Sequence, residues 1–247
     1  MLLRLKYFVP LFFVLFSLQA TAGLSPLRAQ DRDYRSYFLP ANSSAFYGVL
    51  NDAPTVYKSR RLQKDIAWKQ IPEMSAADLH EAFVLLRDEK KLLDGHYRWR
   101  RLPWYFPDSG CFARAESMVN RIESRYGISP FKLFAFGNLV AKTAYEPSGL
   151  VKWWYHVAPV VRVNSLVYVL DPSIEHARPL TLEEWKAALH YEPEFALCNP
   201  HSYDPNSNCK HSSDDQAERA RIDLGKFLTL EWDRLLELGK NPAAFLL

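Results

Sequence analysis

The sequence lacks a strong charge bias, an internal repeat and an apolar run long enough to cross a membrane. The formal net charge is +3 over 247 residues, with Lys and Arg scattered among acids. Nucleic-acid-binding proteins usually carry a basic stripe, so nucleic acid is not the expected partner. The N-terminal apolar run, YFVPLFFVLFSL, has 12 residues, whereas a spanning helix needs roughly 20. The remaining composition, 48% hydrophobic and 24% charged, is that of an ordinary globular protein.

Residues 1–22 have the layout of a secretory signal peptide. Arg4 and Lys6 precede the apolar run, and the stretch Ala20-Thr21-Ala22 fits a small-x-small cleavage site. An uncleaved N-terminal anchor is the alternative. We expect an exported protein, periplasmic or secreted, with no stable membrane association once the signal is removed. Disulfides persist in such a compartment.

Cysteine is scarce, with three residues in the chain. Cys198 and Cys209 lie in the loop-like stretch CNPHSYDPNSNCKH and are the natural disulfide pair. The rival interpretation is a metal site of Cys198, His201, Cys209 and His211. It lacks the Cys-x-x-Cys spacing of zinc sites, and an oxidising compartment argues against it. Cys111 is left without a local partner.

The chain divides at about residue 70. Residues 23–70 have turn signals and no sustained period, and they predict an N-terminal extension, a pro-segment or a hairpin around Asn51-Asp52. Residues 71–247 form the expected catalytic domain. Four helices are predicted in it. The first begins at the capping pair Ser75 and Asp78 and has Gly95 as its C-terminal cap, and the second begins near Cys111 and ends at Gly127. The third and fourth span 181–190 and 215–239.

Three stretches rich in aromatic and β-branched residues predict strands: 131–137, 154–163 and 166–172. They are adjacent in the sequence and are flanked by helices on both sides. The pattern therefore predicts an α+β fold in which an antiparallel sheet packs against helices.

Cys111 is a candidate nucleophile because of its place at the start of a predicted helix. Unpaired backbone N–H groups and the helix dipole favour the thiolate there. Gly110 permits a sharp turn, and the apolar stripe that follows points to a core: Phe112, Ala115, Val119, Ile122 and Tyr126. A small buried structural cysteine is the alternative.

A thiol nucleophile needs a base, and the base needs an orienting group. His156 lies within the strand WWYHVAPVV, and Asp171 ends the next strand before Pro172. A two-residue loop at Asn164-Ser165 makes Asp171 a diagonal neighbour of His156 on one face of a hairpin. A loop with an odd number of residues would separate them. A core histidine and a turn-capping aspartate are the alternatives.

Four motifs resemble the bacterial protein-glutaminase family: GCFARA (110–115), FGNLVAKT (136–143), WWYHVAPVV (153–161) and LDPSIE (170–175). In that family a Gly-Cys-x-Ala-Arg-Ala turn, a Tyr-His-Val-Ala strand and an Asp-Pro-Ser turn carry a Cys–His–Asp triad. The resemblance runs from about residue 71 to 205. It implies a papain/transglutaminase-like core with Cys111 as nucleophile, His156 as general acid and base, and Asp171 as orienter.

The resemblance also implies the activity, hydrolysis of glutamine side-chain amides in proteins or peptides to glutamate and ammonia. No metal or organic cofactor is required, and the partners are proteins or peptides with accessible glutamine. A papain-like cysteine protease or a transglutaminase with the same triad is the alternative, and an inactive binding module is a third possibility.

The chain departs from the family pattern at Glu116, where the family usually has His. Glu116 lies about one helical turn past the nucleophile and is a candidate for substrate contact. Trp154 is a second candidate because strand alternation places it on the face of His156; plain sheet packing is its alternative. We expect Arg114 to form a structural ion pair or to act electrostatically on the site. The short segment 23–70 puts control by a pro-region in doubt.

Overall fold

The computed structural model describes residues 66–190, 192–203, 205, 209 and 216–246. The signal peptide, the possible hairpin around Asn51-Asp52 and His211 lie outside these residues. The described helices are η1 (Trp68–Gln70), α5 (Ala76–Asp88), α6 (Cys111–Tyr126), α7 (Leu182–Ala188), α8 (Gln216–Glu237) and α9 (Pro242–Leu246). The described strands are β1 (Leu92–Leu93), β2 (Trp99–Arg100), β3 (Phe131–Lys142), β4 (Leu150–Val163), β5 (Leu166–Val169), β6 (Leu180–Thr181) and β7 (Glu194–Cys198).

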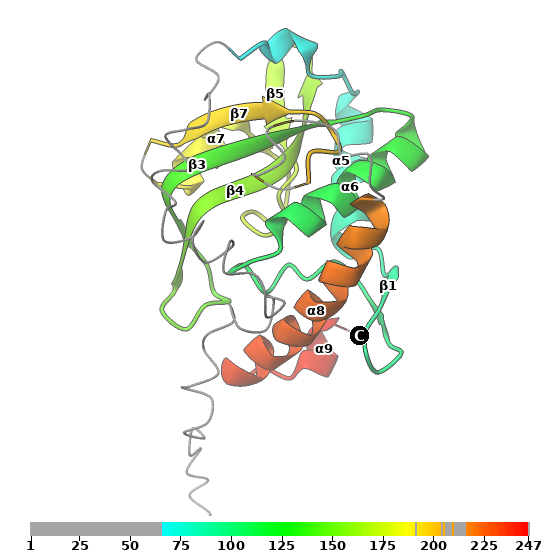
Figure 1. Cartoon of the computed structure of the whole chain (residues 1–247), viewed down its shortest axis with the longest axis vertical. Coiled ribbons are helices and arrows are strands. Elements are labelled where there is room, and N and C mark those ends of the chain that lie inside the picture. Colours follow the sequence, from blue (N-terminus) through cyan, green and yellow to red (C-terminus); the bar gives the residue numbers. More distant parts are fainter. Residues whose placement is uncertain (1–65, 191, 204, 206–208, 210–215, 247) are drawn as a thin grey trace, which may run out of the picture. The chain divides into compact units, whose positions relative to one another are not determined.

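The larger sheet has the strand order β6-β5-β4-β3-β7, and every neighbouring pair is antiparallel. Strands β1 and β2 form a separate two-stranded ribbon. In Figure 1, helix α6 (green) and helix α8 (orange) pack against each other beside the sheet. The predicted α+β fold, with an antiparallel sheet packed against helices, is confirmed.

The helix ends follow the local sequence. The Ser75 hydroxyl accepts a hydrogen bond from the Asp78 N–H at 3.0 Å, which caps α5. Helix α7 has a complete capping box between Thr181 and Glu184. One prediction is wrong: α5 ends at Asp88, and Gly95 lies in the turn between β1 and β2. The chain leaves the helix early because Glu89 is extended, at ψ 124°.

The hairpin of β4 and β5 has the predicted register. Val163 pairs with Leu166 and Val160 pairs with Val169 across the two-residue loop Asn164-Ser165. Asn164 has φ 55°, a left-handed conformation that asparagine tolerates better than most residues. The regular pairing of β5 stops at Val169, so Asp171 lies just beyond the strand rather than in it.

The sheet has an apolar cluster on each face. On the α7 face, Trp185 and Leu189 pack with strand residues such as Leu133 and Ala158. On the α6 face, Cys111 and Ala115 pack with strand residues that include Phe134 and Val157. The segment before α5 also joins the α7 face, where Ile66 and Trp68 cover the cluster. Figure 1 shows how α6 runs along its face, which brings the N-terminus of this helix to the sheet.

A β-bulge interrupts the pairing of β3 with β4. Phe136 pairs with Tyr155, whereas the next pair is Leu139 with Trp153. Two residues of β3 therefore oppose the single residue Trp154, and the alternation of side chains along β4 slips by one position. This slip decides which tryptophan reaches His156.

Candidate active site

Helix α6 begins at Cys111, as the sequence predicts. Gly110 is its N-cap and has φ 83°, in the left-handed region that favours glycine. The glycine also lies against the ring of Phe227 on α8, where an added Cβ would be 2.8 Å from ring carbons. The turn before the nucleophile candidate is therefore fixed by both conformation and packing. Cys111 is buried, with 6% of its surface exposed.

Arg114, in the first turn of α6, holds the segment that precedes Gly110. Its Nη1 donates to the carbonyl oxygens of Pro103, Phe106 and Ser109, the last at 2.8 Å. The side chain is buried, at 1% exposure. The expected structural ion pair is wrong: in the described residues Arg114 satisfies backbone carbonyls instead. Its positive charge also lowers the pKa of Cys111.

Cys111 meets the sheet at an edge that β5 leaves open. Strand β5 pairs with β4 over Val160–Val163, and one further backbone bond runs from the Leu170 N–H to the Pro159 carbonyl. Two residues earlier on β4, the backbone N–H of Val157 helps to lower the pKa of Cys111, after the larger effects of His156 and Arg114. The early end of β5 therefore makes room for the start of α6 beside His156.

His156 and Asp171 form a direct hydrogen bond. The His156 Nε2 lies 2.8 Å from the Asp171 Oδ2. The same carboxylate accepts from the Trp185 Nε1 at 2.8 Å, and its Oδ1 accepts from the Ser173 hydroxyl at 2.5 Å. Three donors therefore fix the orientation of the carboxylate, and the carboxylate fixes the imidazole. His156 Nδ1 makes no hydrogen bond within the described residues, and after Asp171 the neighbouring Cys111 thiol also raises the pKa of the imidazole.

The pKa values of the three groups are mutually dependent. Burial by itself raises the pKa of Cys111, but interaction with the neighbouring His156 imidazolium outweighs burial and lowers it. Burial lowers the pKa of His156, whereas the charge of Asp171 and the hydrogen bond to it raise that pKa to about 9. Asp171 keeps a pKa of about 2 despite burial, because His156 is its close cationic partner. At neutral pH these directions favour a thiolate beside an imidazolium.

Trp153, rather than Trp154, lies on the face of His156. The Trp153 ring stacks on the imidazole with centroids 4.5 Å apart and planes inclined by 21°. Its Nε1 donates to the Pro107 carbonyl at 2.9 Å. Trp154 packs on the opposite face, against the cluster that contains Cys111. The prediction that Trp154 shares the face of His156 is wrong because the bulge in β3 breaks the alternation.

Glu116 points away from the site. It lies five residues after Cys111, which at 3.6 residues per turn is well over a third of a turn from the direction of the thiol. Its carboxylate is fully buried and pairs with Lys132 of β3. The Nδ1 of His201 lies 2.9 Å from the same carboxylate. A substrate contact for Glu116 is therefore contradicted by its burial in an ion pair, which the local sequence does not reveal.

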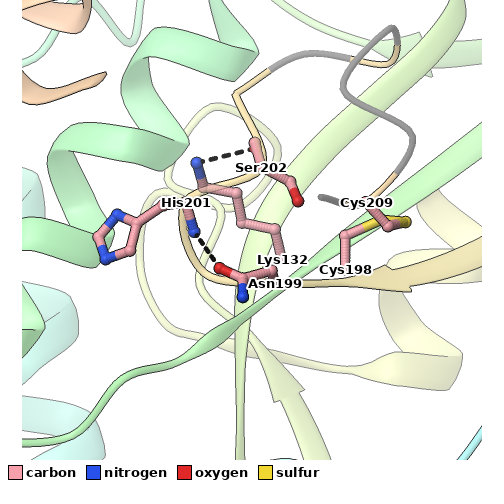
Figure 2. Close-up of a disulfide and its surroundings, with 6 residues drawn as sticks. All are labelled: Lys132, Cys198, Asn199, His201, Ser202 and Cys209. Carbon is pink, nitrogen blue, oxygen red and sulfur yellow. Dashed lines mark hydrogen bonds between the residues drawn. A yellow bond between two sulfur atoms is a disulfide. The ribbon is translucent and has the colours of Figure 1, made fainter. Parts of the chain in front are cut away.

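Cys198 and Cys209 form a disulfide, as predicted, and Figure 2 shows the bridge between the end of β7 and the loop that follows. Both sulfurs are thereby unavailable as thiolate metal ligands, so the rival metal site fails. Within the described residues no group of three or more His, Cys, Asp and Glu side chains is placed to hold a metal. Cys111 is the free thiol of this part of the chain.

The described helices also bear on membrane association. None of them combines the length and the apolar character that a membrane crossing requires.

Sequence reasoning missed three residues around the histidine and aspartate. Trp153, Ser173 and Trp185 contact His156 or Asp171, and all three are ordinary residues in their local stretches. Ser173 lies two residues after Asp171 in the turn that follows β5, within reach of its carboxylate. The other two depend on the bulge and on the docking of α7.

A thiol, an imidazole and a carboxylate on an α+β scaffold are the groups that cysteine-dependent acyl transfer requires. A family model described as Glutaminase matches residues 79–189, which contain all three groups. Over these residues, and in its fold, the chain is similar to the protein-glutaminase family.

The solved structures to which the chain is similar include a crystal structure of protein-glutaminase. The two are 25% identical with a TM-score of 0.52, over 64% of this chain and 88% of that one. The solution structure of protein-glutaminase from Chryseobacterium proteolyticum gives 25% identity and a TM-score of 0.52, over 65% and 89%. A crystal structure of pro-protein-glutaminase shares the fold at 23% identity, with a TM-score of 0.51 over 73% and 67%. No curated protein matches the chain.

Proposed function

We propose that this protein hydrolyses the side-chain amide of glutamine in proteins or peptides, giving glutamate and ammonia. The observation that carries the proposal is the buried Cys111–His156–Asp171 arrangement, in which neighbouring charges favour the thiolate at neutral pH. The similarity to protein-glutaminases supports the choice of glutamine amides over other acyl substrates.

In the proposed first half-reaction the Cys111 thiolate attacks the carboxamide carbon of glutamine. The carbon–nitrogen bond breaks, and the His156 imidazolium gives its proton to the departing nitrogen, which leaves as ammonia. Asp171 keeps the imidazole oriented and stabilises its positive charge. A thioester between Cys111 and the substrate remains.

In the second half-reaction neutral His156 takes a proton from water, and the resulting hydroxide attacks the thioester carbon. The carbon–sulfur bond breaks, glutamate is released and the thiolate beside imidazolium is restored. The backbone N–H of Cys111 is the proposed oxyanion donor, because the first N–H groups of a helix have no partner within the helix. His156 therefore passes one proton through the cycle: it gives a proton to ammonia and regains one from water.

We further propose that residues 1–22 direct export and that the enzyme acts in the periplasm or outside the cell. The Cys198–Cys209 disulfide supports an oxidising compartment. Residues 71–247 are then the catalytic domain, and residues 23–70 are an extension or pro-segment. Because Trp154 packs on the sheet face opposite to His156, we do not assign it a role in binding the glutamine side chain.

The test is ammonia release and intact mass on a glutamine-rich protein substrate, with the wild type beside Cys111→Ala and His156→Ala. We expect stoichiometric ammonia without fragments or cross-links, and loss of both signals in the two variants. His80→Ala is the matched control for the histidine, because His80 is exposed on α5. Fragments would indicate a protease and cross-links a transglutaminase. Full activity of Cys111→Ala would refute the assignment of the nucleophile.

A further inference from the structure

A second buried charge cluster ties the nucleophile helix to the sheet. Glu116 of α6 pairs with Lys132 of β3, and both side chains are fully buried. Lys132 pairs across the strands with Pro159, and Ala135 of the same strand pairs with His156. The ion pair therefore joins the helix that carries Cys111 to the strand beside the one that carries His156. It sets the position of one reacting group relative to the other.

The loop closed by the Cys198–Cys209 disulfide completes this cluster. The carbonyl of Ser202 accepts from Lys132 Nζ at 3.1 Å, and the His201 Nδ1 lies 2.9 Å from Glu116. The turn itself is held by Asn199, whose Oδ1 accepts from the His201 N–H at 3.0 Å. Figure 2 shows Lys132 reaching from the sheet to Ser202 beside the disulfide. A buried charge needs such additional partners to compensate for its lost hydration.

The same loop touches α6 at a second point, next to the nucleophile. Tyr203 is almost fully buried and packs edge-on against Phe112, with ring centroids 5.3 Å apart. Its hydroxyl donates to Asp223 of α8 at 2.8 Å. Phe112 directly follows Cys111, so the loop contacts the first turn of α6 through Phe112 and the second through Glu116.

We propose that the disulfide loop acts as a clamp on helix α6 and that the reactivity of Cys111 depends on the oxidised Cys198–Cys209 bond. Glu116, Lys132 and Tyr203 are positioning residues, since they act through the helix and do not contact the reacting atoms. The proposal rests on the proposed function for its consequence: the enzyme gains full activity only after export, once the disulfide has formed. Before that, the cell's own proteins are spared.

The redox step is a thiol–disulfide exchange. A dithiol gives two electrons and two protons to the bridge, the sulfur–sulfur bond breaks, and the dithiol becomes a cyclic disulfide. Cys198 and Cys209 become thiols, and the far end of the loop is released from β7. Cys111 is unchanged by the exchange, because it has no disulfide to lose.

The test follows the alkylation rate of Cys111 by iodoacetamide at pH 7, with peptide mapping to separate the three cysteines. We compare the oxidised wild type, the wild type reduced with dithiothreitol and freed of reductant, and the Cys198→Ser/Cys209→Ser variant. We expect alkylation about tenfold slower without the disulfide, because displacement of Cys111 from His156 raises the pKa of the thiol and lowers its thiolate fraction. Reoxidation of the wild type restores the rate.

Glu116→Gln tests the route of the effect. It keeps the size of the side chain, removes the charge and slows alkylation in the oxidised protein. Reduction of this variant then has little further effect, because the two changes break one connection and are not additive. The control is Glu218→Gln, which alters an exposed glutamate paired with Arg221 and leaves the rate unchanged.

Equal alkylation rates in oxidised and reduced wild type would overturn the proposal. Global unfolding on reduction, seen as loss of near-ultraviolet circular dichroism, would overturn it too, because the disulfide would then act on the whole fold. Ammonia release is measured in parallel. A wild type that releases no ammonia but shows the redox difference in alkylation refutes the proposed function and leaves the clamp standing.

Discussion

Two buried charge clusters join helix α6 to the same sheet, and they differ in the kinds of ionisable side chain that they contain. At the start of the helix, Cys111 faces His156 and Asp171. Further along, Glu116 faces Lys132 and His201. The first cluster contains a thiol and an imidazole, whose charges depend on each other. The second joins the buried carboxylate of Glu116, whose pKa is lowered chiefly by the Lys132 charge despite burial, to the ammonium of Lys132.

The comparison teaches how one helix combines reaction with position. Burial favours the neutral state in both clusters, and partner charges oppose it in both. For Glu116, burial raises the pKa, but the charge of Lys132 and the hydrogen bonds from Lys132 and His201 lower it by more, so the carboxylate stays ionised. For Cys111 the balance depends on the proton of His156, which the proposed reaction removes and returns. Cys111, whose ionisation the proposed reaction requires, therefore lies beside His156, which can accept and return the proton.

The largest expected effect breaks the first cluster at its nucleophile. Cys111→Ala should lower kcat for glutamine deamidation by at least about 10⁴-fold, because covalent catalysis is lost. The melting temperature should change little, since the substitution removes one buried sulfur. Ammonia release and differential scanning calorimetry measure the two quantities. If the melting temperature fell strongly together with kcat, the loss of activity would reflect a role of Cys111 in the stability of the fold.

Asp171→Asn keeps the shape of the cluster and removes its fixed charge. We expect kcat to fall by about 10⁴-fold, the loss found when the orienting carboxylate of a catalytic triad is changed to an amide. The pKa of His156 should fall from about 9 towards its ordinary value, because the Asp171 charge that raises it is gone. The pH profile of Cys111 alkylation measures this shift. If the alkaline limb of this pH profile did not change, Asp171 would not be the group that raises the pKa of His156.

The second cluster should respond in stability. Lys132→Met should destabilise the protein by about 3 to 5 kcal/mol, because it leaves the buried Glu116 carboxylate without its cation. The double variant Glu116→Leu/Lys132→Met removes both charges and should recover part of this loss. Urea unfolding of the two variants and the wild type gives the free energies. Equal destabilisation of the single and double variants would argue against a buried ion pair.

Trp185→Phe is a milder change to the first cluster. It keeps the ring against the α7-face core and removes the Nε1 donor to Asp171. We expect kcat to fall about tenfold, since one net hydrogen bond to a charged group contributes about 1.5 kcal/mol or more. The KM should change little because Trp185 is fully buried. A change confined to KM would contradict a role through Asp171.

The smallest effect is on the pH dependence of stability. The pKa of His156 is raised from 6.5 to about 9 in the folded protein, so its stabilising contribution is complete below 6.5 and is lost as pH rises through 9. The slope is at most about 1.4 kcal/mol per pH unit for one proton. Asp171, with its pKa lowered from 3.8 to about 2, loses its contribution only as pH falls through that lower range. Urea unfolding between pH 6 and 10, with His156→Gln as control, measures the alkaline slope.

Local patterns could predict much of this structure. The turn Asn164-Ser165 sets the hairpin register, and the glycines at 110 and 127 bound α6. Together these bring Cys111, His156 and Asp171 to one place, as the motif spacing suggests. Such features need only short-range conformational preferences and the alternation of side chains along strands.

The errors share a cause in contacts between distant segments. The bulge of β3 is invisible in the stretch that contains Trp153 and Trp154, so the wrong tryptophan was expected beside His156. Glu116 looks like a residue near the nucleophile until Lys132 is placed opposite it. Arg114 finds carbonyls of a loop that no periodic pattern describes.

The contact between Gly110 and Phe227 has a consequence for the order in which the chain is made. Phe227 belongs to α8, close to the C-terminus, and Glu231 of the same helix holds the N–H of Tyr105 at 2.8 Å. The turn before Cys111 therefore receives its supports from residues that are synthesised after all three reacting groups. A nascent or truncated chain that ends before α8 contains all three reacting groups but not the scaffold that aligns them. We therefore expect such truncated chains to be inactive.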